Sequence, residues 1–170
     1  VVEAERTGAR HKGVYLLPNL FTTGALFAGF YAIVAAMNGL FEAAAVGIIV
    51  AGILDGLDGG VARLTNTQSK FGAEYDSLSD CVAFGVAPGL VAYSWGLSEL
   101  GKFGWMAAFI YLACAALRLA RFNVQAETTD KRFFIGLPSP TGAGLVATLV
   151  WLGASRGIDG NDISWLVAFV

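Results

Sequence analysis

Charged residues are scarce in this sequence. Of its 170 residues only 14% are Asp, Glu, Lys or Arg, whereas 56% are hydrophobic. A soluble domain of this length must cover a large surface with polar groups, and the hydrophobic share lies well above that of an ordinary soluble domain. Together with a mean hydropathy of +0.63, the scarcity of charge excludes a soluble globular domain and predicts a polytopic membrane protein.

Cysteine and histidine are almost absent. The two cysteines, Cys81 and Cys114, lie in apolar runs without the spacing of metal ligands, which is typical of small core residues. The single histidine, His11, stands outside these runs and receives no role. No cleavable signal peptide is expected, because the first apolar run is long and follows basic residues. The chain begins at Val1 and stops at Val170 within an apolar run, so we expect a fragment whose last helix is cut short.

Long apolar runs divide the chain into six predicted helices. A membrane-spanning helix needs about 20 residues, and the runs suit an all-α, polytopic transmembrane bundle in which residues 1–170 form one integral membrane domain. The predicted helices cover about 18–37, 40–63, 73–96, 102–123, 138–154 and 163–170. Residues 1–17 are predicted as a cytoplasmic or juxtamembrane segment, either a short interfacial helix or a solvated tail.

Basic residues gather on one side of the predicted bundle. With a cytoplasmic N-terminus, nine of them lie at cytoplasmic helix ends or loops and two lie outside. Cytoplasmic segments of membrane proteins are enriched in Lys and Arg, so this orientation is favoured. The nine are Arg6, Arg10, Lys12, Arg63, Lys70, Arg118, Arg121, Lys131 and Arg132, and the two are Lys102 and Arg156.

Four aspartates stand near the ends of two apolar runs. Asp55 and Asp58 are spaced i, i+3 and Asp76 and Asp80 i, i+4, so each pair lies on one face of a helix. The short polar segment 64–71 predicts an antiparallel hairpin, which brings both pairs to the cytoplasmic side. One Asp at the bilayer centre costs about 2.5 to 3.5 kcal/mol. Two divalent cations would neutralise all four carboxylates, and the pattern predicts a two-metal site.

Glycines and an arginine accompany the carboxylates. Two metal ions can clamp a diphosphate during in-line displacement, and a carboxylate off the shared centre could take a proton from the attacking hydroxyl. Gly59 and Gly60 would let a phosphate or nucleotide lie against the backbone, and Arg63 can reach a phosphate. Gly52, Gly56 and Gly60 recur every four residues, which predicts close packing of another backbone together with a substrate path. A site within lipid favours a lipid substrate.

The motif resembles that of the CDP-alcohol phosphotransferases. The sequence Asp55-x-x-Asp58-Gly59-x-x-Ala62-Arg63, eight further residues, and Gly72-x-x-x-Asp76-x-x-x-Asp80 match it without a gap. The resemblance covers about residues 16–144, with one departure in 139–142, where Ser-Pro-Thr-Gly replaces a run of small alanines. Five segments are similar to those of bacterial and archaeal phosphatidylserine synthases: 17–24, 63–72, 84–88, 118–123 and 134–140.

The resemblance implies transfer of the phosphatidyl group of CDP-diacylglycerol to the hydroxyl of L-serine, with release of CMP, at the membrane of a prokaryote. It also implies a homodimer, and Asp80 as general base. Mg²⁺ or Mn²⁺ would occupy the site, with Ca²⁺ as a non-productive occupant. The expected metal ligands are Asp55, Asp58, Asp76 and Asp80. The expected contacts of CDP-diacylglycerol are Asn19, Thr22, Gly59, Ala62, Arg63, Ser69 and Gly72. We assign the serine side to Arg118, Arg121 and Asn123, because the serine carboxylate needs a cationic partner.

Two alternatives stay open. The same chemistry could use another acceptor alcohol, glycerol 3-phosphate or an inositol phosphate, for which Lys131, Arg118 and Arg121 would supply basic groups. A protein of a different class, a cation transporter or channel, could use the aspartates as a cation path. The Gly-Gly pair and Arg63 beside the carboxylates favour the enzyme. No nucleic-acid partner is expected.

Overall fold

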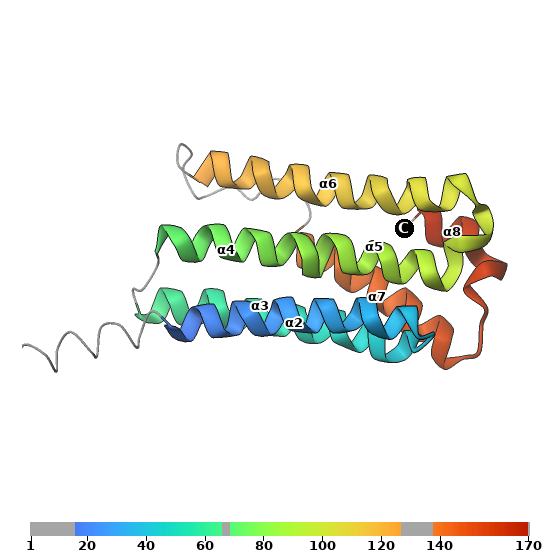
Figure 1. The fold of residues 1–170 in the computed structure, drawn as a ribbon, viewed down its shortest axis with the longest axis horizontal. Coiled ribbons are helices and arrows are strands. Elements are labelled where there is room, and N and C mark those ends of the chain that lie inside the picture. The colour runs from blue at the N-terminus through green and yellow to red at the C-terminus, as the bar shows by residue number, and fades with distance from the viewer. Residues whose placement is uncertain (1–15, 66–68, 127–137, 170) are drawn as a thin grey trace, which may run out of the picture.

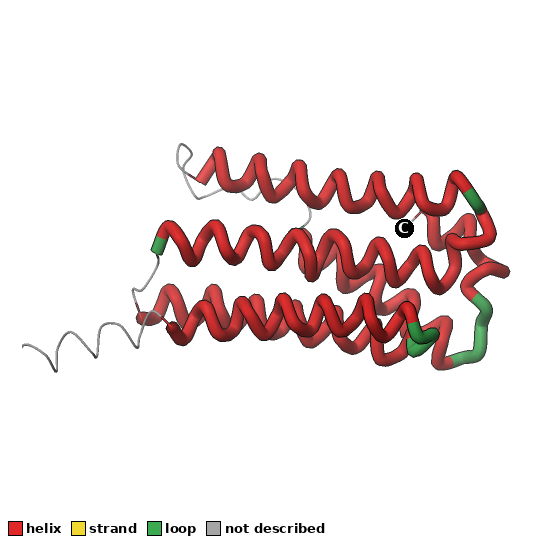
Figure 2. The backbone as a smooth tube through the Cα atoms, viewed as in Figure 1, coloured by secondary structure: helices red, strands yellow, loops and turns green. Residues whose placement is uncertain are grey.

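The computed structural model describes residues 16–65, 69–126 and 138–169, with side chains for 19–60, 69–124 and 138–169. None of these residues lies in a β-strand, and nearly all of them are helical (Figure 2). The predicted all-α bundle is therefore confirmed. Residues 1–15 of the predicted N-terminal segment and the basic pair Lys131 and Arg132 lie outside the described residues, whereas Leu16 and Leu17 belong to the first helix.

Five long helical segments run back and forth along one axis, so that successive segments are antiparallel (Figure 1). The third segment is continuous over Lys70–Leu100 but mixes helix types. The elements are α2 (Leu16–Met37), α3 (Phe41–Thr65), α4 (Lys70–Asp80), the π-helical η1 (Cys81–Val86), α5 (Ala87–Ala92), the π-helical η2 (Tyr93–Leu97), the 3₁₀ turn η3 (Ser98–Leu100), α6 (Lys102–Ala126), α7 (Ser139–Ser155), the 3₁₀ turn η4 (Gly160–Ile163) and α8 (Ser164–Phe169).

Large hydrophobic side chains cover the outside of the bundle. Three helical segments are long and apolar enough to cross a membrane: Asn19–Met37, Lys70–Leu100 and Lys102–Val124. The last of them, in α6, is the least covered by the rest of the protein. Exposed hydrophobic surface of this extent is stable in lipid and not in water. The side chains that α6 exposes include Phe103, Trp105, Phe109, Ile110, Leu117 and Phe122.

The interior is built mainly from alanine. Ala32, Ala44 and Ala45 are fully buried where α2 packs against α3. A Cβ atom on Gly47 would lie 3.1 Å from the carbonyl oxygen of Ala28, so the two backbones are almost in contact. Small residues permit such close approach of helices within membranes. The tightly packed α2–α3 pair fixes the position of the first acidic helix.

The third segment accommodates a proline by widening its turns. Pro88 lies in the first turn of α5, directly after the π-helical segment η1. Because proline has no N–H, the carbonyl of Phe84, four residues earlier, loses its usual α-helical donor. The hydroxyl of Tyr111 on α6 donates to this carbonyl at 3.1 Å. The bond satisfies a buried polar group and ties α6 to the third segment.

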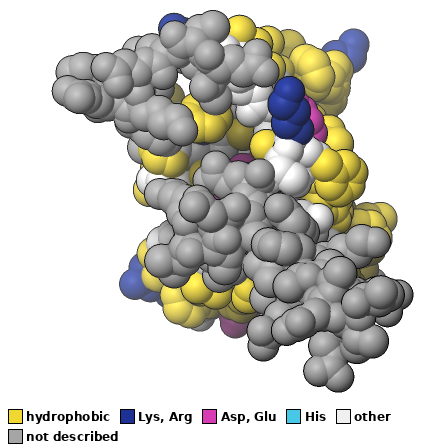
Figure 3. Space-filling model, turned by 90° about the vertical axis from the view of Figure 1, so that its left-hand side faces the viewer, with side chains coloured by type: hydrophobic (Ala, Val, Ile, Leu, Met, Phe, Trp, Pro, Cys, Tyr) yellow, Lys and Arg dark blue, Asp and Glu magenta, His cyan; other side chains and the backbone are white. Residues whose placement is uncertain are grey.

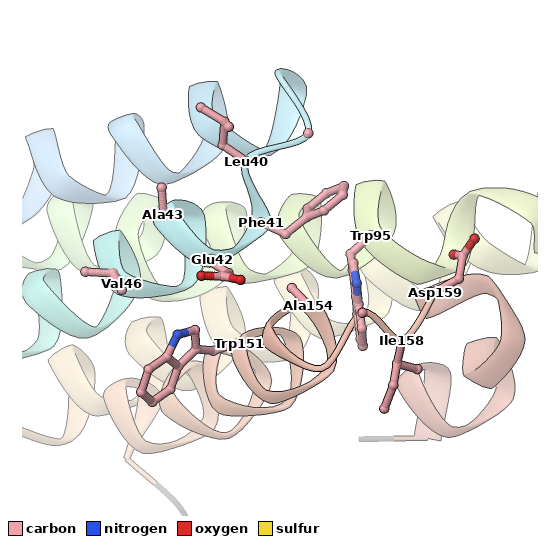
Figure 4. A pocket seen from close by; sticks show the side chains of 12 residues that line it. Leu40, Phe41, Glu42, Ala43, Val46, Trp95, Trp151, Ala154, Ile158 and Asp159 are labelled. Atoms are coloured by element: carbon pink, nitrogen blue, oxygen red, sulfur yellow. The ribbon is translucent and has the colours of Figure 1, made fainter.

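A pocket of about 870 Å³ lies at the end of the bundle where α2 turns into α3. Figure 4 shows it between the start of α3 and the C-terminal part of α7, with Trp95 and Trp151 on its wall. The indole of Trp95 fills the space that a side chain on Gly153 would need. The aspartates of the motif do not line this pocket, which lies at the other end of α3 from Asp55.

Candidate active site

The turn between α3 and α4 is closed by a helix cap. Ser69 has extended backbone angles, φ −112° and ψ 151°, and its Oγ accepts a hydrogen bond from the N–H of Gly72 at 2.9 Å. Such a cap satisfies one of the free N–H groups at the start of a helix. The chain therefore reverses between Thr65 and Lys70, and the two acidic helices run antiparallel with their aspartates at the same end of the bundle (Figure 1).

Three carboxylates from the two acidic helices form one group. Asp55 on α3 and Asp76 and Asp80 on α4 each offer an oxygen, and these oxygens all lie within 4.8 Å of one another. All three side chains are half-buried. Mg²⁺ binds oxygen ligands at about 2.0–2.1 Å and Ca²⁺ at about 2.3–2.6 Å, so oxygens on one ion are within about 5 Å of each other. The carboxylate group fits a hard divalent cation.

The fourth predicted ligand, Asp58, lies one helical turn from Asp55 and is not part of this group of three. It is buried, and its Oδ2 accepts a hydrogen bond from the hydroxyl of Thr22 on α2. Thr22 was expected among the contacts of CDP-diacylglycerol. Its hydroxyl binds a carboxylate of the predicted metal site, and its contact with CDP-diacylglycerol stays a prediction.

Three other predicted CDP-diacylglycerol contacts come together at the start of α4. A Cβ atom on Gly72 would lie 3.1 Å from Ser69 Oγ and 3.5 Å from Asn19 Oδ1. The absence of a side chain on Gly72 thus leaves room for polar groups from α2 and from the α4 cap. Gly59 is half-buried on α3, and Ala62 and Arg63 lie near the end of α3 with side chains outside the described part.

The glycine repeat of α3 has a different surrounding from the one predicted. Within the described part of the chain, and apart from the adjoining turns of α3 itself, no heavy atom lies within 4 Å of a Cβ atom on Gly56 or Gly60, and Gly52 meets only Phe84 at 3.9 Å. The expected close packing of another backbone on this repeat is therefore wrong for the described helices. Open space beside Asp55 agrees with the other part of that expectation, a path for a substrate.

The residues assigned to the serine side lie on α6. Arg118 Nη1 donates to the hydroxyl of Ser139, the buried first residue of α7, at 2.6 Å. Asn123 Nδ2 donates to Ser77 Oγ at 2.9 Å, and Ser77 follows Asp76 directly. The third, Arg121, has an exposed side chain. Asn123 therefore binds to a helix that carries two of the carboxylates, and Arg118 binds to the start of α7.

Sequence reasoning missed the serines of this region. Ser77 and Ser79 stand between the two aspartates of α4, and Ser139 begins α7. Their signal in the sequence is position alone, small hydroxyl residues inside the motif or at a helix start.

The view onto this end of the bundle shows hydrophobic side chains over much of the described surface, with Lys and Arg side chains at several places around it (Figure 3).

The sequence that carries these aspartates has counterparts in known proteins. The model of the CDP-alcohol phosphatidyltransferase family matches residues 15–170. The chain belongs to this family. This membership agrees with the motif of four aspartates, and it confirms the predicted class of enzyme, a phosphotransferase that acts on CDP-alcohols.

Several relatives of this chain carry the name CDP-diacylglycerol–serine O-phosphatidyltransferase. The one from Helicobacter pylori is 44% identical over 158 residues, which are 92% of this chain and 67% of the relative. The one from Mycobacterium tuberculosis is 40% identical over 169 residues, 95% of this chain and 58% of the relative. The one from Bacillus subtilis is 38% identical over 124 residues, 73% of this chain and 69% of the relative. The chain thus spans between about half and two thirds of the length of these relatives.

Proposed function

We propose that this protein transfers the phosphatidyl group of CDP-diacylglycerol to the hydroxyl of L-serine and releases CMP. The observation that carries the proposal is the group of three carboxylates formed by Asp55, Asp76 and Asp80. The chain belongs to a family of CDP-alcohol phosphatidyltransferases, and relatives at 44% and 40% identity are named for the serine reaction. Together these support serine as the acceptor.

All four aspartates would hold the two divalent ions, and Asp80 would also be the general base. Asp55, Asp76 and Asp80 would hold one ion, and Asp58 would contribute to the second. Bound Mg²⁺ or Mn²⁺ would neutralise the diphosphate and stabilise charge on the leaving oxygen. Asp80 accepts the proton of the serine hydroxyl as its oxygen attacks the phosphorus next to the diacylglycerol. The bond from that phosphorus to the bridging oxygen breaks, and CMP leaves.

The depth of the carboxylates suits a lipid substrate. Asp55 lies ten residues before the end of α3 at Thr65, and Asp80 lies ten residues after the start of α4 at Lys70. At 1.5 Å per residue this is about 15 Å below the helix ends. Asp80 also lies 20 residues before the end of the third segment at Leu100, which is about 30 Å at the same rise. A hydrocarbon core is about 30 Å thick, so with Leu100 at one edge of the core the carboxylates would lie near the other edge. The diphosphate of a lipid can reach this level while its acyl chains stay in the bilayer.

The remaining polar groups are assigned to the two polar parts of the substrates. Asn19, Ser69 and Gly72 form the side for the CDP moiety, with Arg63 as its partner for a phosphate. On the other side, Arg118 is held by Ser139, which would orient its guanidinium toward the carboxylate of serine. We place this site on the cytoplasmic side, because basic residues gather there. The homodimer implied by the resemblance stays a prediction.

The test is CMP release by the purified full-length protein in the presence of CDP-diacylglycerol and Mn²⁺ or Mg²⁺. We expect release that depends on L-serine. Release with glycerol 3-phosphate or an inositol phosphate alone would keep the phosphotransferase and overturn serine as its acceptor. Failure to release CMP with any of these acceptors, together with cation flux across vesicles that contain the protein, would overturn the enzyme in favour of a transporter.

A further inference from the structure

Three buried polar residues connect α2, α3 and α4 beside the carboxylate group. Thr22, Asp58 and Ser79 have 3%, 6% and 2% of their surface exposed. The hydroxyl of Ser79 donates to the main-chain carbonyl of Thr22 at 3.1 Å, and the hydroxyl of Thr22 donates to Asp58 Oδ2. Each helix supplies one residue. The two hydrogen bonds therefore join both helices of the acidic hairpin, α3 and α4, to the same residue of α2.

The bond from Thr22 acts on a carboxylate. A buried carboxylate needs hydrogen-bond donors, because its removal from water is otherwise very unfavourable. A donor on Oδ2 fixes the orientation of the Asp58 side chain and leaves its other oxygen for a cation. Hydrogen bonds of this kind orient the ligands of metal sites and tune their affinity. Thr22 stands 36 residues from Asp58 in the sequence, so the bond also fixes α2 against α3.

The bond from Ser79 acts on the second acidic helix. Ser79 directly precedes Asp80, and consecutive residues of an α-helix point about 100° apart. Asp76 and Asp80 lie on the face of α4 that meets Asp55 of α3, whereas Ser79 lies on the face that meets α2. Its bond therefore fixes the rotation of α4 about its own axis. A change of that rotation would move both aspartates of α4 relative to Asp58.

We propose that Thr22 is the positioning residue of the metal site: its hydroxyl orients Asp58, and its carbonyl, through Ser79, sets the rotation of the helix that carries Asp76 and Asp80. The inference rests on the proposed function, because it concerns the divalent cations of that reaction. Thr22 acts on the metal site through Asp58 and Ser79.

The test measures binding of Mn²⁺ to the purified full-length protein in detergent. Electron paramagnetic resonance reports the bound Mn²⁺, and no nucleotide or serine is added. Thr22→Val keeps the shape of the side chain and removes its hydroxyl. Loss of such an outer partner typically lowers metal affinity by about 10- to 100-fold, and we expect this loss for Thr22→Val. Thr22→Ser restores the hydroxyl, and its Mn²⁺ affinity should return to near that of the unchanged protein.

Thr23→Val is the matched control. The hydroxyl of Thr23 lies 3.0 Å from the hydroxyl of Tyr75, so this substitution also removes a hydrogen bond between α2 and α4. It touches no aspartate, and we expect an unchanged Mn²⁺ affinity. Equal losses for Thr22→Val and Thr23→Val would mean that any weakening of the α2–α4 contact has this effect, and would overturn the specific role of Thr22.

The outcomes separate this inference from the proposed function. If the unchanged protein binds no Mn²⁺, the metal site of the proposed function is wrong and the role of Thr22 falls with it. If it binds Mn²⁺ and Thr22→Val binds equally well, the role of Thr22 is overturned and the proposed function stands. Should Thr22→Val fail to fold, Ser79→Ala provides the second test, with a smaller loss of Mn²⁺ affinity expected and an unchanged affinity contradicting the proposal.

Discussion

The two ends of the bundle are built on opposite principles. At the end that carries the motif, polar side chains are buried and bind across helices, as Asp58 does with Thr22 and Asn123 with Ser77. At the other end, helices close on an aromatic side chain, the indole of Trp95 against Gly153. Buried polar groups that form hydrogen bonds between helices therefore distinguish the end that carries the motif. The volume of a pocket does not distinguish it, because the pocket described above lies at the other end.

The pocket at the Trp95 end illustrates this difference. Its two carboxylates, Glu42 and Asp159, are both exposed. Asp159 also has a local role, since its Oδ1 accepts the N–H of Asn161 at 3.0 Å and caps the short helix η4. Exposed carboxylates are solvated and need no cation. The half-buried carboxylates of Asp55, Asp76 and Asp80 do need one, or a proton, when they come this close.

Removal of divalent cations should produce the largest difference between the two ends. With EDTA we expect CMP release to fall by at least about 10³-fold, because metal ions supply several kcal/mol of stabilisation to the transition state. The helical fold should persist, because the Trp95 end and the alanine packing of Ala32, Ala44 and Ala45 between α2 and α3 contain no predicted cation ligand. Activity and circular dichroism measured on the same sample check this, and activity that survives EDTA would contradict the metal site.

Asp80→Asn should have the next largest effect. The amide can still occupy the site but cannot take a proton from the serine hydroxyl, so turnover should fall by roughly 10²-fold or more. Binding of CDP-diacylglycerol should be largely retained. Single-turnover kinetics and a lipid-binding assay measure the two quantities separately. Near-normal turnover would show that another group is the base.

Arg118→Ala should weaken the binding of the acceptor, serine. If the guanidinium held by Ser139 binds the serine carboxylate, its loss should raise the KM for serine by about 10- to 100-fold, in line with about 1.5–3 kcal/mol for a hydrogen bond to a charged group. The KM for CDP-diacylglycerol should change little. Arg121→Ala, with its exposed side chain, is the matched comparison, and an effect of equal size there would contradict the special place of Arg118.

Gly153→Ala tests the opposite end. The new methyl group would overlap the indole of Trp95, and overpacking of this kind costs about 1–3 kcal/mol. We expect a lower midpoint of thermal unfolding in detergent with an unchanged Mn²⁺ affinity of the folded protein. A lowered Mn²⁺ affinity without loss of stability would show that the two ends are coupled.

Glu42→Gln should have the smallest effect. Its carboxylate lies on the wall of the pocket at the Trp95 end (Figure 4), and surface substitutions usually change stability by no more than about 0.5 kcal/mol. CMP release and Mn²⁺ affinity should stay within about two-fold of the unchanged protein, since 0.4 kcal/mol corresponds to about that factor. A large loss of activity would show that this pocket also takes part in the reaction.

The sequence predicts those parts of the molecule that depend on local spacing. The membrane bundle follows from apolar runs, and the group of Asp55, Asp76 and Asp80 follows from two spacings and one short turn. Contacts between distant segments have no such signal. The bond of Thr22 to Asp58 joins residues 36 positions apart, and the bond of Arg118 to Ser139 joins two helices whose crossing no periodicity reveals.

Two further features show why pattern alone falls short. The spacing of Gly52, Gly56 and Gly60 is the same whether a helix or an open space lies beside it, so the predicted packing was wrong for the described helices. The residues of the π-helical turns η1 and η2, Cys-Val-Ala-Phe-Gly-Val and Tyr-Ser-Trp-Gly-Leu, carry no pattern that separates them from an apolar α-helix. Pro88 is the one residue of that segment whose type predicts an irregular helix.

The π-helical turn η1 fixes a phase angle within one membrane helix. It lies between the acidic half that carries Asp76 and Asp80 and the half where Gly89 faces Ala108 of α6. A π turn holds more residues than the 3.6 of an α turn. Six residues in these wide turns rotate the chain about as far as five residues in α-helical turns, so deletion of one residue from Cys81–Val86 would give a regular α-helix whose two halves keep their relative rotation. Winding all six residues as an α-helix would instead rotate one half against the other by roughly 100°, and with the packing face kept, the aspartates would point away from α3. The wide turns thus absorb one extra residue and keep the aspartates directed at α3.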